Sequence, residues 1–304
     1  MATVSGGTLS VRAQGLWARL ARSESARGYA LVSPTFLYAL LLLLAPILVI
    51  IAFSFWTQDY LTIDRTATLA NYREAWSDPL YRTLMFRSLG VSALVTAITV
   101  LLAYPMAYYL SFHGGQRKAL WLFLITIPFW TSYLLRVFAW KIILGYNGVV
   151  NASLMELGIL AQPMEFLLYN VNAVVITLAH AWAPFAILPI FVSLEKIDRS
   201  LLEAATDLGD GPLRRFLRVT LPLSLPGVVA AALIVFIPTV GDYVTPRLVG
   251  GKDGLMIANM IQVQFGKAND WPLGAALAVS TMAIVTAASL AFALLVRQLG
   301  TRFR

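Results

Sequence analysis

The side chain best placed to attract a cation is a single carboxylate, Asp242, at the edge of a long apolar segment. An acid inside or beside a membrane-spanning segment is a functional candidate, because a charge is costly to hold there. Aromatic residues from several apolar segments accompany it, and a ring face binds an ammonium group by about 0.5–2 kcal/mol. These residues are Phe129, Trp130, Tyr133, Trp182 and Tyr243. Together they predict a path that attracts a small cation weakly enough to release it.

Two basic residues in one of the apolar segments complicate this interpretation. Arg136 and Lys141 suit a zwitterion or an anion better than a dication. We expect Arg136 either to extend towards the membrane surface or to stack on Trp140, four residues later. Two structural roles for the candidate residues also stay open. In the first, the aromatic rings pack helices together or anchor them at the interface. In the second, Asp242 forms an ion pair with Arg136 or Arg247.

A second group of charges, residues 195–222, interrupts the apolar sequence with five Lys/Arg and five Asp/Glu. Ser200 and Glu203 have the spacing of a capping box, which predicts the start of a helix. Gly209 predicts the end of that helix, and Pro212 predicts the start of a second one. The charged segment is therefore expected to contain two short helices joined by a sharp turn.

The first of these helices carries different side chains on different faces. Ala204 and Ala205 are small, whereas Glu203 and Asp207, four residues apart, project from another face. Small residues permit close approach of another protein, and charges fix the register of a contact more than its affinity. The pattern favours a helix that docks into a groove on another protein, and a solvated loop is the alternative. The second helix is expected to end at Leu221–Pro222, where the chain re-enters the bilayer.

Composition and apolar segments indicate an integral membrane protein. The chain is 59% hydrophobic and 12% charged, whereas soluble domains contain about 25% charged residues. Six segments are long enough to cross a hydrocarbon layer of about 30 Å, so we predict an all-α membrane protein with six transmembrane helices. The predicted spans are residues 31–57, 88–112, 119–143, 171–194, 223–241 and 272–297.

The distribution of basic residues predicts the orientation of the spans. Fourteen Lys/Arg fall in the two terminal segments, the 113–118 loop and segment 195–222, and seven fall in the opposite loops. Both termini and segment 195–222 are therefore expected in the cytoplasm. We divide the chain into an N-terminal tail (1–30), a six-span domain (31–300) and a C-terminal tail (301–304). The net charge of +8 does not indicate nucleic-acid binding, because the bases lie mostly in short loops.

Motifs of catalysis and cofactor binding are absent from the sequence. The Gly-Lys pairs at 251–252 and 266–267 lack the spacing of a P-loop and its following hydroxyl, so no ATP site of that kind is expected. There is no Cys, and His113 and His180 are isolated, so no metal site is predicted. His180 is expected to be a hydrogen-bonded core residue. An intramembrane enzyme would need paired acids or a nucleophile with a base, and the sequence shows no such group. A secondary transporter would need ionisable relays or internal repeats, and the sequence shows neither feature.

Segment 195–222 resembles the cytoplasmic signature of the permease subunits of bacterial ABC importers. That signature reads Glu-Ala-Ala, three residues, Gly, nine residues, Ile or Val, one residue, Leu-Pro. Every fixed position matches, at Glu203, Ala204, Ala205, Gly209, Val219, Leu221 and Pro222. In that family the segment forms a coupling helix that fits a cleft in the ATPase subunit and transmits its closure to the membrane helices. The resemblance assigns Asp207, within the motif, to the same contact.

Four other stretches resemble the permease subunits of polyamine importers, the putrescine and spermidine systems. They are LANYREAW (69–76), IPFWTSYLLRVFAWKIILGYNGVVN (127–151), VFIPTVGDYVTPRLVGG (235–251) and NDWPLGAALA (269–278). With the spans, the resemblance covers nearly the whole chain after residue 30. Two positions depart from it. Asp242-Tyr243 replaces the Glu-Phe of many relatives, which keeps the charge and adds a hydroxyl, and Arg247 replaces an acid of some relatives.

The resemblance implies a permease subunit of a type I ABC importer in a bacterial inner membrane. Its implied partners are a second, paralogous permease, two ATP-binding subunits and an extracytoplasmic solute-binding protein. ATP and Mg would bind the ATPase subunits, and this chain would hold no cofactor and would not be an enzyme. The implied solute is putrescine or spermidine. The alternative, which Arg136 and Arg247 would suit, is another small solute such as an amino acid, an opine-like zwitterion or an aminophosphonate.

Overall fold

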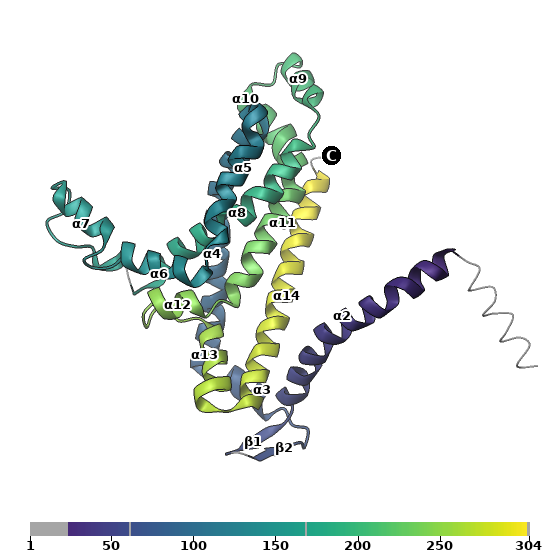
Figure 1. Ribbon diagram of the computed structural model, residues 1–304, viewed down its shortest axis with the longest axis vertical. Coiled ribbons are helices and arrows are strands. Elements are labelled where there is room, and N and C mark those ends of the chain that lie inside the picture. Colours follow the sequence, from purple (N-terminus) through teal and green to yellow (C-terminus); the bar gives the residue numbers. More distant parts are fainter. Residues whose placement is uncertain (1–23, 61, 168, 303–304) are drawn as a thin grey trace, which may run out of the picture. The chain divides into compact units, whose positions relative to one another are not determined.

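The computed structural model describes residues 24–60, 62–167 and 169–302, and nearly all of their regular structure is helical (Figure 1). The all-α prediction is thereby confirmed. One antiparallel hairpin, β1 (Thr57–Asp59) and β2 (Thr62–Asp64), is the only sheet in these residues. The chain divides into two compact units, residues 1–53 and 54–304, which are described separately below.

The first unit contains one long apolar helix, α2 (Glu24–Ser54), which includes Pro34 and Pro46. Its residues 28–54 are long and apolar enough to cross a membrane, as predicted for residues 31–57. The helix begins at Glu24, so the last residues of the predicted N-terminal tail are helical. The rest of that tail, residues 1–23, lies outside the described residues, and the proposed boundary at residue 30 stays a prediction.

Four long helices of the second unit correspond to four predicted spans, 88–112, 171–194, 223–241 and 272–297. They are α4 (Pro79–His113), α8 (Val171–Glu195), α11 (Leu221–Val240) and α14 (Trp271–Arg302). Helix α4 is longer than predicted, because Asp78 caps it by accepting a hydrogen bond from the Leu80 N–H at 2.7 Å. Among the described residues, five helices including α2 are long and apolar enough to span a bilayer.

The third predicted span, residues 119–143, is not one straight helix. It forms α5 (Lys118–Thr126), a 3₁₀ turn (Ile127–Trp130) and α6 (Tyr133–Ile143), and the axes of the two halves meet at 87°. The break follows from local sequence, since Pro128 sits in the 3₁₀ turn and Thr131 is extended, with ψ 151°. Counted as one broken span, the pair supplies the sixth crossing.

Short elements gather at both ends of the second unit (Figure 1). One end carries the hairpin, α3 (Ala70–Ser77) and α13 (Ile257–Val263), and the other carries α9 (Arg199–Asp207) and α10 (Pro212–Arg215). The remaining short elements are α7 (Val149–Glu156), α12 (Val244–Val249), 3₁₀ turns at Gly115–Arg117 and Glu165–Leu167, and π-helical turns at Phe216–Thr220 and Gln264–Ala268. The hairpin is fixed to the start of α14, because the Gln58 side chain donates to the Asn269 carbonyl at 2.6 Å.

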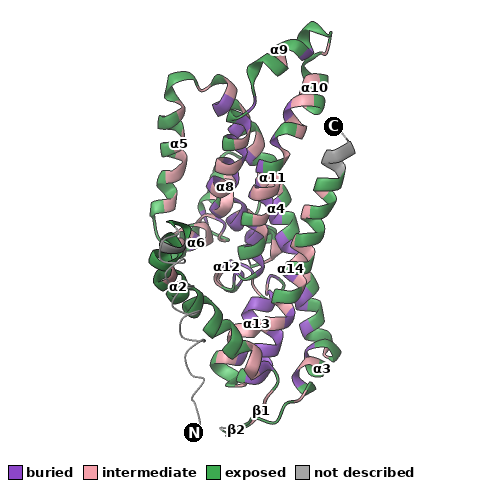
Figure 2. Cartoon of the chain, turned by 90° about the vertical axis from the view of Figure 1, so that its right-hand side faces the viewer, coloured by how far each residue is buried: buried purple, intermediate pink, exposed green. Residues whose placement is uncertain are grey.

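The core of the second unit lies between α4, α8 and α11, and Figure 2 shows buried residues along these three helices. Hydrophobic burial drives little association inside a bilayer, so close packing of small residues matters more. Gly227 of α11 packs directly against α8, where an added Cβ would collide with the Ser193 Cβ and the Pro189 carbonyl oxygen. Buried alanines continue this close contact on both helices, at Ala186, Ala231 and Ala232.

Gly227→Ala is expected to destabilise the protein by about 1–3 kcal/mol, because an extra methyl group would overpack the α8–α11 contact. Gly90→Ala is the matched control. Gly90 also lies in a long apolar helix, but a Cβ atom added there would meet nothing within 4 Å, so no loss of stability is expected. The measurement is the thermal unfolding midpoint of the purified protein in detergent. Equal midpoints for the two variants would contradict the packing argument.

Candidate functional site

The charged segment 195–222 forms the end of the second unit that carries α9 and α10, opposite the end with α13 (Figure 1). We call residues 195–222 the coupling segment. Helix α9 begins at Arg199, and its N-cap is Asp198, whose carboxylate accepts a hydrogen bond from the Ser200 N–H at 3.0 Å. That hydrogen bond lowers the pKa of Asp198 below its ordinary value. The predicted capping box of Ser200 and Glu203 is therefore wrong by two residues, because the earlier acid satisfies the helix start.

The end of α9 agrees with the sequence prediction. Gly209 has φ +85°, a left-handed conformation that L side chains avoid, and it directly follows the last residues of the helix. Pro212 opens α10, also as predicted. The second helix does not end at Leu221–Pro222, however. A π-helical turn joins α10 to α11, so that one apolar helical stretch runs from Pro212 to Val240.

Two polar contacts fasten α9 and the turn that follows it to this continuous helix. The Arg215 guanidinium donates to Thr206 Oγ1 at 3.0 Å, and the Arg218 guanidinium pairs with the Asp210 carboxylate at 3.2 Å. Below them, the Phe216 ring meets the Tyr104 ring of α4 edge-on, with centroids 5.6 Å apart. The coupling segment is thus a folded unit attached to α4 and α11, and not a loose loop.

The signature residues divide into an outward and an inward group. Glu203, Ala204 and Asp207 are exposed on α9, and the neighbouring Leu208 side chain is 87% exposed. The inward group is buried or half-buried: Ala205, Val219, Leu221 and Pro222. The side chains of the outward group are uncovered by the rest of the described chain and project from the end of the unit. The exposed face of α9 is compatible with a docking helix.

The second candidate site is a cluster of side chains where α6, α8 and α12 meet. We call it the aromatic cluster, and it comprises Phe129, Tyr133, Arg136, Trp182, Phe185 and Asp242. Ring centroids of Tyr133 and Trp182 lie 6.5 Å apart, and those of Trp182 and Phe185 lie 5.6 Å apart. Figure 2 places α6 and α12 roughly midway between the two ends of the bundle. The cluster therefore lies far from the coupling segment.

Asp242 is 9% exposed, and its carboxylate accepts hydrogen bonds from three groups. Its Oδ2 accepts from the Tyr133 hydroxyl at 2.5 Å, and its Oδ1 accepts from the Val244 N–H at 2.9 Å and the Thr245 N–H at 3.4 Å. No ion pair of Asp242 with Arg136 or Arg247 occurs in the described part of the chain. The carboxylate therefore binds the first N–H groups of α12 and ties that helix to α6, and it shares the cluster with the Arg136 guanidinium without pairing with it.

Arg136 does not stack on Trp140, so that alternative for it is wrong. Its guanidinium lies over the Phe129 ring at 4.4 Å and the Tyr133 ring at 5.7 Å from the centroids. The break between α5 and α6 brings the Phe129 ring back towards α6, which the assumption of a straight span could not anticipate. Arg136 Nε is buried without a hydrogen-bond partner among the described residues. Trp140 instead donates to His180 Nδ1 at 3.1 Å.

Three predicted residues lie outside the aromatic cluster. Trp130 is 75% exposed and packs against Phe123, and the Tyr243 side chain is 45% exposed. Arg247 is exposed and donates to the Gln262 side chain at 3.2 Å. His180 is hydrogen-bonded as predicted but exposed, so it is not a core residue.

Sequence reasoning missed Phe185 and Thr245, which belong with the aromatic cluster. The Phe185 ring meets the Phe129 ring edge-on, with centroids 4.2 Å apart, and Thr245 Oγ1 lies 2.6 Å from the Tyr133 hydroxyl. Phe185 follows Trp182 by three residues, and helical spacing alone places the two rings on one face. That signal was available in the sequence.

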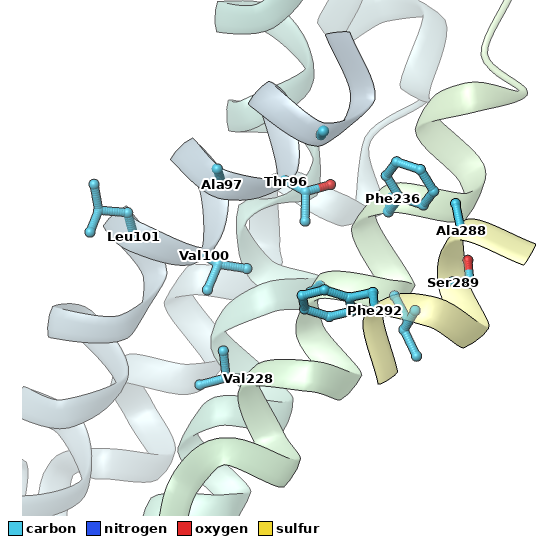
Figure 3. A pocket seen from close by; sticks show the side chains of 12 residues that line it. Thr96, Ala97, Val100, Leu101, Val228, Phe236, Ala288, Ser289 and Phe292 are labelled. Atoms are coloured by element: carbon cyan, nitrogen blue, oxygen red, sulfur yellow. The ribbon is translucent and has the colours of Figure 1, made fainter. Parts of the chain in front are cut away.

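An apolar groove of 470 Å³ between α4, α11 and α14 has different chemistry (Figure 3). Thr96 and Val100 of α4, Phe236 of α11 and Phe292 of α14 line it. Its hydroxyls come from Thr96 and Ser289, and no charged side chain contributes to it. A charged solute would have no counter-charge in this groove, so the aromatic cluster is the better candidate for such a solute.

The fold and the coupling segment define the class of protein. A chain of a solved bacterial ABC transporter, involved in the import of the acidic polysaccharide alginate, superposes with a TM-score of 0.69. The two sequences are 17% identical, and the match covers 94% of this chain and 98% of the other. The structure therefore has the fold of an ABC importer permease.

The particular family follows from the sequence comparison. Residues 66–304 match the family described as the binding-protein-dependent transport system inner membrane component, and this chain belongs to it. The spermidine/putrescine transport system permease protein PotB of Escherichia coli is 38% identical over 249 residues, which cover 82% of this chain and 90% of that protein. PotB of Haemophilus influenzae is 37% identical, with 82% and 86% covered.

Proposed function

We propose that this chain is the permease subunit of an ATP-driven importer for putrescine or spermidine. The observation that carries the proposal is the identity of 38% with a relative named for spermidine/putrescine transport, over most of both chains. The geometry of the aromatic cluster supports it, since the buried charge of Asp242 lies beside ring faces that can host ammonium groups.

The proposed complex contains a second, paralogous permease, two ATP-binding subunits and an extracytoplasmic solute-binding protein. ATP and Mg would bind the ATPase subunits. The twofold excess of basic residues on the side of the coupling segment supports a cytoplasmic location for that segment and both termini. ATP-driven closure of the ATPase pair would move α9, open the paired permeases outward and admit the solute near Asp242. Hydrolysis would return them to the inward-facing state.

A second candidate solute is a zwitterion such as an amino acid or an aminophosphonate. The observation that favours it is the guanidinium of Arg136 within the aromatic cluster, with its Nε unpaired among the described residues. A guanidinium binds carboxylate and phosphonate groups well and repels ammonium groups. The two candidates therefore assign opposite roles to the two charged residues of the cluster.

The proposal predicts that polyamines stimulate ATP hydrolysis by the purified complex. The complex would be reconstituted in lipid with its binding protein, and hydrolysis would be measured with putrescine, spermidine, amino acids and aminophosphonates. Stimulation by putrescine or spermidine alone is the expected result. Stimulation by a zwitterion or anion alone would overturn the polyamine assignment and retain the importer.

A further inference from the structure

Three helix ends near the coupling segment meet at one carboxylate. Glu195, the last residue of α8, accepts hydrogen bonds on Oε1 from Ser111 Oγ of α4 at 2.8 Å and from Lys118 Nζ at 2.9 Å. The Lys118 ammonium also contacts Glu195 Oε2 at 2.7 Å. Lys118 is the first residue of α5. We call Ser111, Lys118 and Glu195 the Glu195 clamp.

The clamp lies at the connection between α9 and α8, through which a movement of α9 would reach the membrane helices. Only Lys196, Ile197 and Asp198 separate Glu195 from the first residue of α9, and Ile197 is 8% exposed, so this connection is short and anchored. The side chains of Lys118 and Glu195 are 31% and 32% exposed. The ion pair is therefore partly protected from solvent. In the ion pair of Arg218 with Asp210, the two side chains are 69% and 16% exposed.

Helix α5 depends on the clamp because little else holds it. None of its residues is buried, and only Leu122 and Ile125 pack against the core of the unit from a half-buried position. The far end of α5 leads through its 3₁₀ turn into α6, and this arm carries Phe129, Tyr133 and Arg136 of the aromatic cluster. A displacement of the start of α5 would therefore move one wall of the cluster.

We propose that the Glu195 clamp transmits the movement of α9 to the α5–α6 arm and so couples ATP hydrolysis to rearrangement of the aromatic cluster. Glu195 and Lys118 are positioning residues, since neither touches the solute. The inference rests on the coupling role of α9 in the proposed function. It adds a second connection by which the movement of α9 could reach the aromatic cluster, through α8 and α5. The first connection is the attachment of α9 to α10 and α11.

The test compares Glu195→Gln, Lys118→Met and the charge-reversed double variant Glu195→Lys with Lys118→Glu in the reconstituted complex. Putrescine uptake per ATP hydrolysed is expected to fall about threefold in each single variant, a size suited to a half-exposed ion pair. The double variant is expected to recover most of this loss. Arg117→Met is the matched control, because Arg117 is exposed, lies outside the coupling segment and has no ion pair in the described part of the chain.

A second measurement does not depend on the solute. The chain has no Cys, so nitroxide labels can be attached to Leu124→Cys on α5 and Val192→Cys on α8, both of which are exposed. With an intact clamp, one narrow distance distribution is expected, and Glu195→Gln should broaden it. Unchanged distances in Glu195→Gln would overturn the clamp.

The same set of variants separates a failure of the clamp from a failure of the proposed function. If Glu203→Lys uncouples transport while Glu195→Gln and Lys118→Met do not, the clamp is wrong and the coupling role of α9 stands. If Glu203→Lys leaves uptake per ATP unchanged, the coupling role itself is wrong. If no variant takes up putrescine and a zwitterion is taken up instead, the solute assignment fails. In that case the nitroxide distance measurement still tests whether the Glu195 clamp holds α5 against α8.

Discussion

Glu203→Lys and Gly209→Pro should abolish most solute uptake while the protein still reaches the membrane. Glu203 is exposed on α9, so its replacement disturbs no packing within the chain. Reversal of a charge at a protein contact costs several kcal/mol when it faces a complementary charge, which predicts a loss of uptake of about tenfold or more. Basal ATP hydrolysis should persist, because the ATP sites lie on other subunits in the proposed complex.

The glycine variant acts on the shape of the turn after α9. Proline requires φ near −65°, whereas Gly209 has φ +85°, so Gly209→Pro must rebuild the turn. A milder pair of variants isolates the backbone effect. Gly209→Ala forces an L side chain into the left-handed region at a cost of about 1–2 kcal/mol, whereas Gly211 has φ −65° and tolerates alanine. Both glycines have open space around a Cβ atom, so conformation alone distinguishes them.

The measurements are solute uptake and ATP hydrolysis by the reconstituted complex, together with the amount of ATPase subunit that copurifies. Gly209→Ala should reduce uptake per ATP, and Gly211→Ala should not. Normal uptake by both Glu203→Lys and Gly209→Pro would refute the coupling assignment. Loss of copurification with an intact membrane domain would place the defect at the docking surface.

Five of the long apolar helices and the two short helices of the coupling segment could be predicted because their signals are local. A span needs only a run of apolar residues, and the turn after α9 needs only a glycine at the right position. The predicted cap at Ser200 failed because Asp198, two residues earlier, offers an equally good acceptor. The predicted end at Leu221–Pro222 failed because a π-helical turn, Phe216–Thr220, continues the helix up to Pro222 and beyond.

The aromatic cluster could be predicted only in part, because its contacts join distant segments. The Tyr133–Asp242 hydrogen bond connects residues 109 positions apart. The position of Arg136 depends on a bend of 87° between α5 and α6, and hydropathy does not report such a bend. Residue type alone correctly grouped Asp242 with the rings of Tyr133 and Trp182. The side chains that contact Asp242 and Arg136, however, could be identified only from the folded structure.

Asp242→Asn should reduce putrescine uptake about tenfold, more than Asp242→Glu, if the charge of the cluster attracts the solute. The amide variant is informative because it can keep the local structure. Its oxygen can still accept from the Val244 and Thr245 N–H groups, and its NH₂ group can donate to the Tyr133 hydroxyl. The Tyr133 hydroxyl would then donate to Thr245 Oγ1, at a separation of 2.6 Å. The change therefore removes the negative charge with little loss of hydrogen bonding.

Tyr133→Phe is the matched control, because it removes the hydrogen bond between Tyr133 and Asp242 and keeps the charge. Putrescine uptake should be less affected by Tyr133→Phe than by Asp242→Asn. Equal losses in Asp242→Asn, Asp242→Glu and Tyr133→Phe would mean that Asp242 only caps α12. Each variant would be checked for assembly with the partner subunits, so that a folding defect is recognised.

The sign of the effect also identifies the charge of the solute. For a dication, Asp242→Asn lowers uptake, and Arg136→Gln raises it by removing a like charge that lies over the Phe129 ring. For a solute with a carboxylate or phosphonate group, the order reverses, because Arg136 attracts that group and Asp242 repels it. The measurement is the uptake of putrescine and of an aminophosphonate by Asp242→Asn and by Arg136→Gln. A polyamine importer requires that putrescine uptake falls in Asp242→Asn and rises in Arg136→Gln.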